Sequence, residues 1–216
     1  GAPLDIVFNA QQNTAYVVNF ASSTVSKCSV SAEGNISSCV DSGGTGFNSP
    51  RAMILNSSDA IAYVGNNDST VSQCTVNGDG SLSACVNSGG TGFNKPAGFA
   101  LNTTGNRMYI SNQANNTVSK CTVNINGSLS GCANTGSGFS NPYAILLNPA
   151  GNIAYIANYS NNTVSKCSVN ADGSFTGCLT TGSGFNTPAG LVMDNSGFII
   201  YVTNKSTSTV SKCSVN

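Results

Sequence analysis

The chain has 216 residues, only 7% of them charged, and its eight basic and eight acidic side chains cancel. It is long enough to bury a substantial core, and its solubility must come from uncharged polar residues. No cluster of Lys and Arg provides the basic surface that nucleic acid or anionic lipid requires, and no apolar run approaches the roughly 20 residues of a membrane span. We therefore expect neither nucleic-acid partners nor membrane insertion.

Five copies of one unit follow each other along the chain. A proline opens each copy and a tyrosine lies within it, both spaced by 46 or 47 residues: Pro3, Pro50, Pro96, Pro142 and Pro188; Tyr16, Tyr63, Tyr109, Tyr155 and Tyr201. In the second copy four short apolar or β-branched segments follow in the order RAMILN, IAYVGN, TVSQCTV and SLSACV. The last two flank Asp79-Gly80, a hairpin-turn dipeptide because Gly tolerates positive φ. The unit is predicted to be a four-stranded antiparallel meander.

Four-stranded units at this spacing are typical of propeller blades, which stack because one blade cannot bury both its faces. We predict an all-β fold, a five-bladed β-propeller of four-stranded antiparallel blades in a single domain, 1–216. The fifth blade is three-stranded, because the sequence holds no fourth segment after Cys213. The predicted blades span about 1–42, 43–88, 89–134, 135–180 and 181–216. A flat solenoid is the alternative, which antiparallel hairpin turns disfavour.

The second segment also carries a family resemblance. "YVTN" stands at Tyr201 to Asn204, and the other copies carry variants such as "YVGN" and "YIAN", each followed by "TVS". With the proline-opened first segment, this pattern resembles the YVTN-type β-propeller repeats of bacterial extracellular and surface proteins, relatives of the lactonase-like propellers. The resemblance spans the whole chain and implies the fold. That repeat carries many functions on one scaffold, so it implies no particular activity.

Eight cysteines form four pairs, each centred on a glycine-containing turn and separated by eleven residues: Cys28 and Cys39, Cys74 and Cys85, Cys121 and Cys132, Cys167 and Cys178. A two-residue turn would place the members of a pair opposite each other, which predicts four hairpin disulfides and an oxidising, extracytoplasmic compartment. A longer turn with a bulge would instead leave buried thiols on opposite faces of the sheet. Bridges between neighbouring blades are a third arrangement.

Cys213 has no counterpart eleven residues later. We predict a free thiol in a monomer, with a dimer linked through Cys213 as the alternative. The chain has no histidine, and eleven-residue spacings are unlike those of structural zinc sites. No metal and no cofactor is predicted.

Acid–base chemistry near neutral pH most often uses histidine, and most of the few carboxylates fall in turns. Asp5 and Asp194 are exceptions, because they lie on first strands and can face a central channel. Asp194 stands where the other copies carry Asn9, Asn56, Asn102 and Asn148, so a polar ring that holds water or a cation is a hypothesis. Without histidine we predict no catalytic residue and no enzyme.

Recognition is expected on the face formed by the loops between second and third strands and the loops between blades. The most varied positions of the repeat belong to this face, and we predict binding residues there: Phe20, Arg51, Tyr143, Tyr159 and Lys205. Phe47, Phe93, Phe139 and Phe185, shared by all the inter-blade loops, are expected in the core, with a sugar platform as the alternative.

The function expected from these features is a secreted or surface-exposed, non-enzymatic module that binds a protein or a glycan. Two alternatives remain. One is a lactonase- or lyase-like enzyme that uses the central channel, and the other is a structural spacer within a longer repeat protein.

Overall fold

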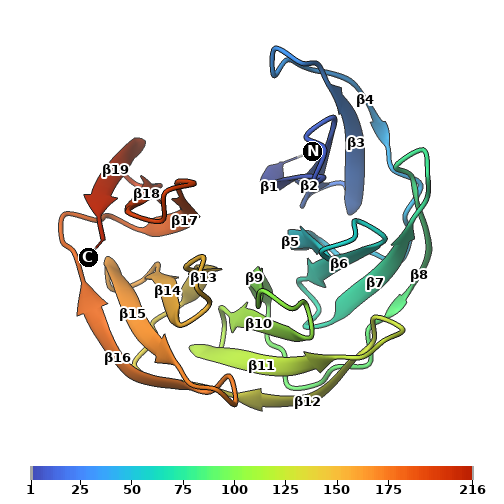
Figure 1. The fold of residues 1–216 in the computed structure, drawn as a ribbon. Coiled ribbons are helices and arrows are strands. Elements are labelled where there is room, and N and C mark those ends of the chain that lie inside the picture. Colours follow the sequence, from blue (N-terminus) through green and yellow to red (C-terminus); the bar gives the residue numbers. More distant parts are fainter. Residues whose placement is uncertain (1, 216) are drawn as a thin grey trace. The chain divides into compact units, whose positions relative to one another are not determined.

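The computed structural model describes residues 2–215, which form 19 strands in five antiparallel sheets (Figure 1). Each sheet is one blade, and its strands lie side by side in chain order. The prediction of an all-β propeller with a three-stranded fifth blade is confirmed. Residues 1 and 216, which the predicted first and last blades include, lie outside the described residues.

Each of the first four blades has four strands of six or seven residues. The first blade contains β1 (Pro3–Phe8), β2 (Thr14–Asn19), β3 (Thr24–Val30) and β4 (Ile36–Asp41). The second contains β5 (Pro50–Leu55), β6 (Ile61–Asn66), β7 (Val71–Val76) and β8 (Leu82–Asn87). The third contains β9 (Pro96–Leu101), β10 (Arg107–Asn112), β11 (Thr117–Val123) and β12 (Leu129–Asn134). The fourth contains β13 (Pro142–Leu147), β14 (Ile153–Asn158), β15 (Thr163–Val169) and β16 (Phe175–Thr181). The fifth contains β17 (Pro188–Met193), β18 (Ile199–Asn204) and β19 (Thr209–Ser214).

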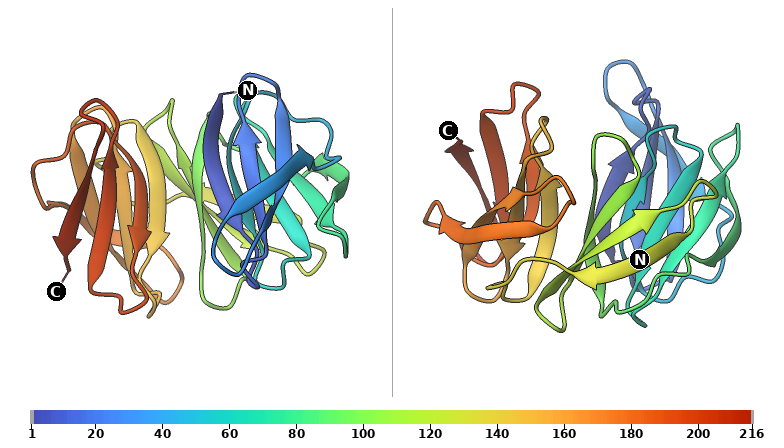
Figure 2. Two further views of the ribbon diagram at one scale, coloured as in Figure 1. Left: turned by 90° about the horizontal axis from the view of Figure 1, so that it is seen from above. Right: turned by 60° about the horizontal axis from the view of Figure 1, so that its bottom comes forward.

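The chain divides into two compact units. Unit one comprises residues 1–96 and 123–130, and unit two comprises residues 97–122 and 131–216. The first two blades therefore lie in unit one and the last two in unit two. The single domain over 1–216 stays a prediction. Figure 2 shows the strands from two further directions. Among the described residues there is no helix long and apolar enough to cross a membrane.

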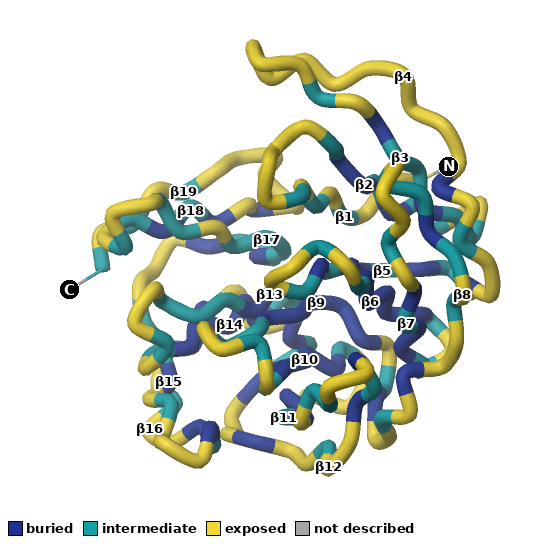
Figure 3. Tube along the Cα trace, turned by 45° about the vertical axis from the view of Figure 1, so that its right-hand side comes forward, coloured by how far each residue is buried: buried dark blue, intermediate teal, exposed yellow. Residues whose placement is uncertain are grey.

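The second strands carry most of the core. Each of β6, β10 and β14 is buried at five of its six positions, whereas β4 is exposed at all six (Figure 3). In unit one, Tyr16 and Val18 of the first blade pack against Met53, Leu82 and the inter-blade Phe47. All four inter-blade phenylalanines are at most 9% exposed, so the core prediction for them is confirmed and the sugar platform is wrong.

An asparagine at the end of each second strand, buried in four of the five blades, explains the "N…T-V-S" part of the repeat. The Asn66 side-chain amide donates to the Thr70 hydroxyl (3.1 Å) and to the Ser72 hydroxyl (2.9 Å), and its carbonyl oxygen accepts the backbone N–H of Asn48 (3.1 Å). Asn158 and Asn204 repeat this pattern in unit two. One side chain thus connects two strands and an inter-blade loop, since a buried amide must have its hydrogen-bonding groups satisfied.

The repeated tyrosine joins one blade to the next. The Tyr16 hydroxyl donates to the backbone carbonyl of Gly80 (2.7 Å), which lies in the outer hairpin turn of the second blade. Tyr63 donates in the same way to Gly127 (2.6 Å) and Tyr109 to Gly173 (2.9 Å). The outer hairpin turns of the second, third and fourth blades are therefore bonded to the blade before them.

The outer hairpins differ from the expected two-residue turn. In the first blade three residues, 32–34, form the turn, with Gly34 at φ 82° and a hydrogen bond from the Ser31 N–H to the Asn35 carbonyl (2.9 Å). One further residue, Ser38, bulges out of β4 at φ 50°, between the pairs Lys27–Val40 and Ser29–Ser37. The longer turn shifts the register by one residue and the bulge shifts it back, so both irregularities together place the cysteines opposite each other.

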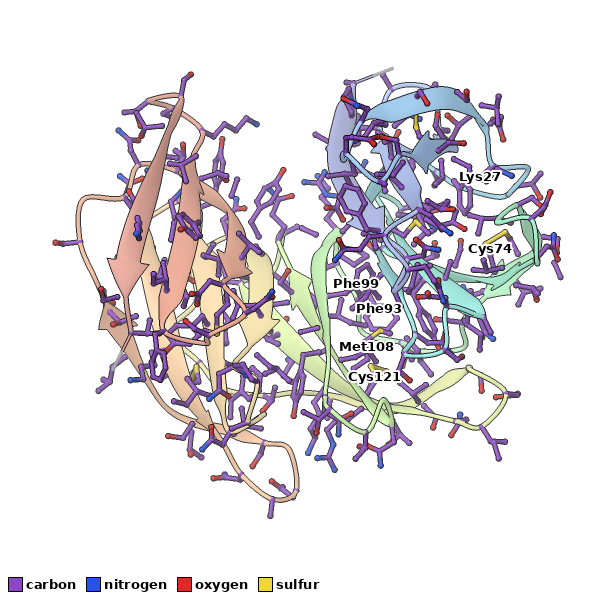
Figure 4. All side chains as sticks on the ribbon, turned by 45° about the horizontal axis from the view of Figure 1, so that its top comes forward. Lys27, Cys74, Phe93, Phe99, Met108 and Cys121 are labelled. Carbon is purple, nitrogen blue, oxygen red and sulfur yellow. A yellow bond between two sulfur atoms is a disulfide. The ribbon has the colours of Figure 1, made fainter. Side chains whose placement is uncertain are left out.

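Four disulfides close these hairpins, with Cα–Cα distances of 4.0 to 4.1 Å (Figure 4): Cys28–Cys39, Cys74–Cys85, Cys121–Cys132 and Cys167–Cys178. The predicted pairing is confirmed. The expectation that a turn with a bulge would separate the sulfurs is wrong, because the two register shifts cancel. Among the described residues Cys213 is the free cysteine, and burial raises the pKa of its thiol.

Replacement of Tyr63 by Phe tests the link between blades. The substitution leaves the buried carbonyl of Gly127 without its partner, which costs about 1 to 3 kcal/mol of unfolding free energy. Urea unfolding measures the change. Tyr201→Phe is the matched control, because the Tyr201 hydroxyl has no hydrogen-bond partner among the described residues. Equal effects of the two substitutions would contradict the proposed link.

A thiol titration of the unfolded, unreduced protein tests the cysteine assignment. We expect about one equivalent per chain, from Cys213, since a pairing of all other cysteines leaves one thiol. A dimeric mass that reduction converts to a monomer would assign Cys213 to an intermolecular bridge. No thiol in a monomer would mean that Cys213 pairs within the chain.

Candidate functional site

The two most variable positions of the repeat lie on the loop face, which we define as the loops between second and third strands, the inter-blade loops and the first residues of the strands that follow those loops. The post-proline position carries Leu4, Arg51, Ala97, Tyr143 and Ala189. The post-asparagine position carries Phe20, Asn67, Gln113, Tyr159 and Lys205. Within each unit the structure brings residues from both positions into contact, although they are far apart in sequence.

In unit one these residues form an arginine cluster of Phe20, Arg51 and Asn67. The Arg51 guanidinium donates to the side-chain oxygen of Asn67 (3.1 Å), and its central carbon lies 5.8 Å from the centre of the Phe20 ring. A guanidinium over an aromatic face is favourable and fixes the orientation of the cation. Two of the predicted binding residues, Phe20 and Arg51, are thus neighbours.

In unit two the other three predicted residues form a tyrosine cluster of Tyr143, Tyr159 and Lys205. The two rings are 5.3 Å apart between centroids and tilted by 32°. The Lys205 ammonium lies 5.6 Å from the centre of the Tyr159 ring. The structure therefore brings the five predicted residues together in two groups, one in each unit, and their role in binding stays a prediction.

Asp5 is the carboxylate with the most unusual surroundings. It lies on β1, where one oxygen accepts the backbone N–H of Ile6 and the other that of Met53 on β5, both at 2.9 Å. Burial raises the pKa of Asp5, and these two hydrogen bonds only partly oppose it. Arg51 precedes Met53 by two residues, so their Cα atoms are roughly 7 Å apart on an extended strand. Asp5 thus lies in the same region of unit one as the arginine cluster.

Sequence reasoning considered Asp5 but did not select it. The signal that distinguishes it is internal, because the other copies carry only small residues at this position: Ala52, Gly98, Ala144 and Gly190. A carboxylate that replaces a small residue where neighbouring first strands come together is not required by the fold. Its raised pKa could not be foreseen, since it depends on contact with β5.

The proposed polar ring at the ends of the first strands has a local structural explanation. The side-chain oxygen of Asn56 accepts the backbone N–H groups of Ala60 (2.9 Å) and Ile61 (3.0 Å) and so closes the turn between β5 and β6. Asp194 does the same for its own turn, where it accepts the backbone N–H groups of Phe198 and Ile199. The hydrogen bond from the Ser196 hydroxyl lowers the pKa of Asp194 most, and these backbone N–H groups lower it further. These side chains are committed to turns.

A polar cavity of about 520 Å³ lies on the turn side of unit one, between the first two blades. Its two carboxylates already have partners: Asp59 accepts the backbone N–H of Ala10 (2.7 Å), and hydrogen bonds from Ser81 lower the pKa of Asp79. Because the pKa of Asp79 is lowered and Asp59 is held by a backbone N–H, this cavity is the weaker candidate for acid–base chemistry. No three His, Cys, Asp or Glu side chains within residues 2–215 gather as a metal site would require.

Comparison with known proteins identifies the family. The model of the lactonase family, described as a seven-bladed β-propeller, matches residues 2–136, which is more than half of the chain. The chain belongs to the lactonase family. It contains five copies of the blade, whereas the family description names seven. No curated protein matches the sequence significantly.

Solved structures agree with this fold at low sequence identity. The periplasmic gluconolactonase PpgL of Pseudomonas aeruginosa is 13% identical with a TM-score of 0.77, over 99% of this chain and 66% of that one. A presumed 6-phosphogluconolactonase from Bacteroides uniformis is 16% identical with a TM-score of 0.72, over 98% and 67%. A functionally unknown protein from Desulfotomaculum acetoxidans is 14% identical with a TM-score of 0.72, over 99% and 68%. This chain thus spans about two thirds of their length, and the likeness concerns the fold.

Family membership corrects the expected function. The sequence led to a non-enzymatic binding module, chiefly because the chain has no histidine. That inference is wrong, because the lactonase family match favours the enzymatic alternative. The resemblance to lactonase-like propellers is confirmed, and the YVTN assignment stays a prediction.

Asp5→Asn tests whether the Asp5 carboxylate is desolvated. Because folding raises the pKa of Asp5, its contribution to stability is present at low pH and is lost as the pH rises through the folded-state pKa. The variant lacks this loss. The difference between its urea midpoint and that of the wild type should therefore shift in favour of the variant as the pH rises from 4 to 7. Asp59→Asn is the control, since Asp59 also accepts a backbone N–H across the two blades. An equal gain for both variants would contradict desolvation at Asp5.

Proposed function

We propose that this chain hydrolyses lactones and that Asp5 and Arg51 of unit one carry the reaction. The observation that supports this most is the raised pKa of Asp5 beside β5, the strand that carries Arg51, in a member of the lactonase family. A carboxylate whose pKa is raised is a stronger base, so it can take the part that histidine plays elsewhere.

The first step that these residues can perform is activation of water. Each oxygen of Asp5 accepts one backbone N–H, and a carboxylate oxygen has a second lone pair that can accept a proton from water. The water oxygen attacks the lactone carbonyl carbon while its proton passes to Asp5. Ionised Asp5 is required, so the rate should fall as the pH drops through the raised pKa.

In this proposal Arg51 stabilises the oxyanion that forms on the carbonyl oxygen. Its guanidinium is positively charged at every relevant pH, and the contacts with Asn67 and Phe20 hold it in one orientation. When the intermediate collapses, the bond to the ring oxygen breaks. The proton held by Asp5 then passes to the released alkoxide, which leaves a hydroxy acid and regenerates the carboxylate.

The disulfides bear on where this reaction takes place. Four intrachain disulfides indicate an oxidising, extracytoplasmic environment. Within that range we propose that the protein is secreted or displayed at the cell surface and acts as a monomer on small-molecule substrates.

A lactone-hydrolysis assay of Asp5→Asn tests the proposal. Glucono-δ-lactone and 6-phosphogluconolactone are suitable substrates, and removal of a general base should lower kcat by roughly 100-fold or more. The slope of the wild-type pH–rate profile at acidic pH should disappear in the variant. Arg51→Lys keeps the charge but loses the planar donors, and should also lower kcat.

Asp59→Asn is the matched control, because Asp59 is another aspartate of unit one with a backbone N–H partner. It should retain wild-type activity. A wild type that hydrolyses neither lactone faster than buffer, or an Asp5→Asn variant of undiminished kcat, would overturn the proposal.

A further inference from the structure

The tyrosine cluster of unit two is not required by the fold. At the post-proline position the third and fifth blades have Ala97 and Ala189 where the fourth has Tyr143. At the post-asparagine position the second and third blades have Asn67 and Gln113 where the fourth has Tyr159. Blades of the same strand order form with these smaller or more polar residues, so the two tyrosine rings serve something other than folding.

The backbone beneath the rings is nevertheless held firmly. The carbonyl of Tyr143 accepts a hydrogen bond from the Ser111 hydroxyl on β10. Gly98 lies against the same carbonyl, and a Cβ atom at that position would collide with it. The Tyr159 N–H donates to the Asn141 carbonyl (3.1 Å). The two rings therefore stand on a fixed support, as binding residues on a scaffold do.

The loop face of the fourth and fifth blades carries a positive charge. Its segments contain no acidic residue. The loop-face segments of the fourth and fifth blades are 135–144, 158–163, 181–190 and 204–209, and they contain Lys205 but no Asp, Glu or Arg. Lys205 is exposed and its ammonium lies over the Tyr159 ring. A ligand that touches both the rings and the ammonium would gain most if it carried a negative charge.

We propose that Tyr143, Tyr159 and Lys205 bind a sugar ring that bears a carboxylate or a phosphate. The C–H groups on one face of a pyranose carry a partial positive charge and pack against the negative face of an aromatic ring. The two rings, 5.3 Å apart and tilted by 32°, both belong to partly exposed residues on which such a sugar can pack, and Lys205 binds the anionic substituent. This site goes beyond the proposed lactone hydrolysis and does not depend on it.

Saturation-transfer NMR with glucuronate, glucose 6-phosphate and glucose tests the site. These probes are not lactones, so the measurement does not depend on turnover. The wild type should bind at least one anionic sugar at least five-fold more tightly than glucose. The preferred probe identifies the anionic group as carboxylate or phosphate. Loss of lactone hydrolysis with sugar binding intact would refute the proposed function alone.

Substitutions copied from sibling blades keep the fold while removing the site. Tyr143→Ala copies Ala97, and Tyr159→Gln copies Gln113. Each should weaken binding of the preferred sugar at least ten-fold. Lys205→Gln, which also copies Gln113, should abolish the preference over glucose.

Lys120→Gln is the matched control. It copies Gln73 of the second blade, and Lys120 contacts the outer hairpin turn of the fourth blade through the Asp172 carbonyl (3.0 Å). This variant should bind like the wild type. The proposal fails if the wild type binds neither anionic sugar, binds glucose equally well, or keeps its affinity and preference in all three cluster variants.

Discussion

The loop face depends on the asparagine that ends each second strand, which is buried in the second to fifth blades. Its amide donates to a threonine and a serine of the third strand, and its oxygen accepts the N–H of an inter-blade loop. The residue that follows it is the post-asparagine position, so Phe20, Asn67, Tyr159 and Lys205 of the two clusters project from a backbone that this amide holds. Loss of the asparagine would leave several buried polar groups unsatisfied at once. This requirement explains why the asparagine recurs in every copy while its neighbour varies freely.

The fold could be predicted because its sequence pattern is repeated along the chain. Strand order and blade number follow from a pattern that occurs five times, and cysteine pairing from one that occurs four times, so an error in one copy is corrected by the others. The turn of the outer hairpin could not be predicted at the same level. Whether Gly34 ends a two-residue or a three-residue turn depends on the bulge at Ser38, and a positive φ at a serine has no clear sequence signal. The pairing prediction was right although its turn was wrong, because two register shifts cancel.

The candidate site was predictable only in part, for a related reason. Variation between copies located the positions that form both clusters, since those positions are free of the demands of the fold. It did not identify Asp5 as a base, because the pKa of a carboxylate is set by burial and by partners on another strand. The absence of histidine was given too much weight. The surroundings that the fold gives a side chain, which set its pKa, decide its chemistry more than its residue type does.

The contacts on the turn side show why the loop face can vary. The Lys27 ammonium, labelled in Figure 4, donates to the Asp79 carbonyl of the next blade (2.7 Å). The same ammonium lies 3.8 Å from the Asp79 carboxylate. One blade further on, Gln73 donates to the Asn126 carbonyl (2.7 Å), with no charge on either residue.

The hydrogen bond to the backbone is therefore the element that is kept, and the ion pair at 3.8 Å on an exposed surface adds little. Together with the tyrosine hydroxyls, these bonds join successive blades on the turn side. On the loop face the bonds between blades use other residues, such as the Ser49 N–H to the Ser23 hydroxyl (3.0 Å) and the Asn141 N–H to the Asn116 side-chain oxygen (2.6 Å). The post-proline and post-asparagine side chains are therefore free to vary, and chemistry can be placed there on a repeated scaffold.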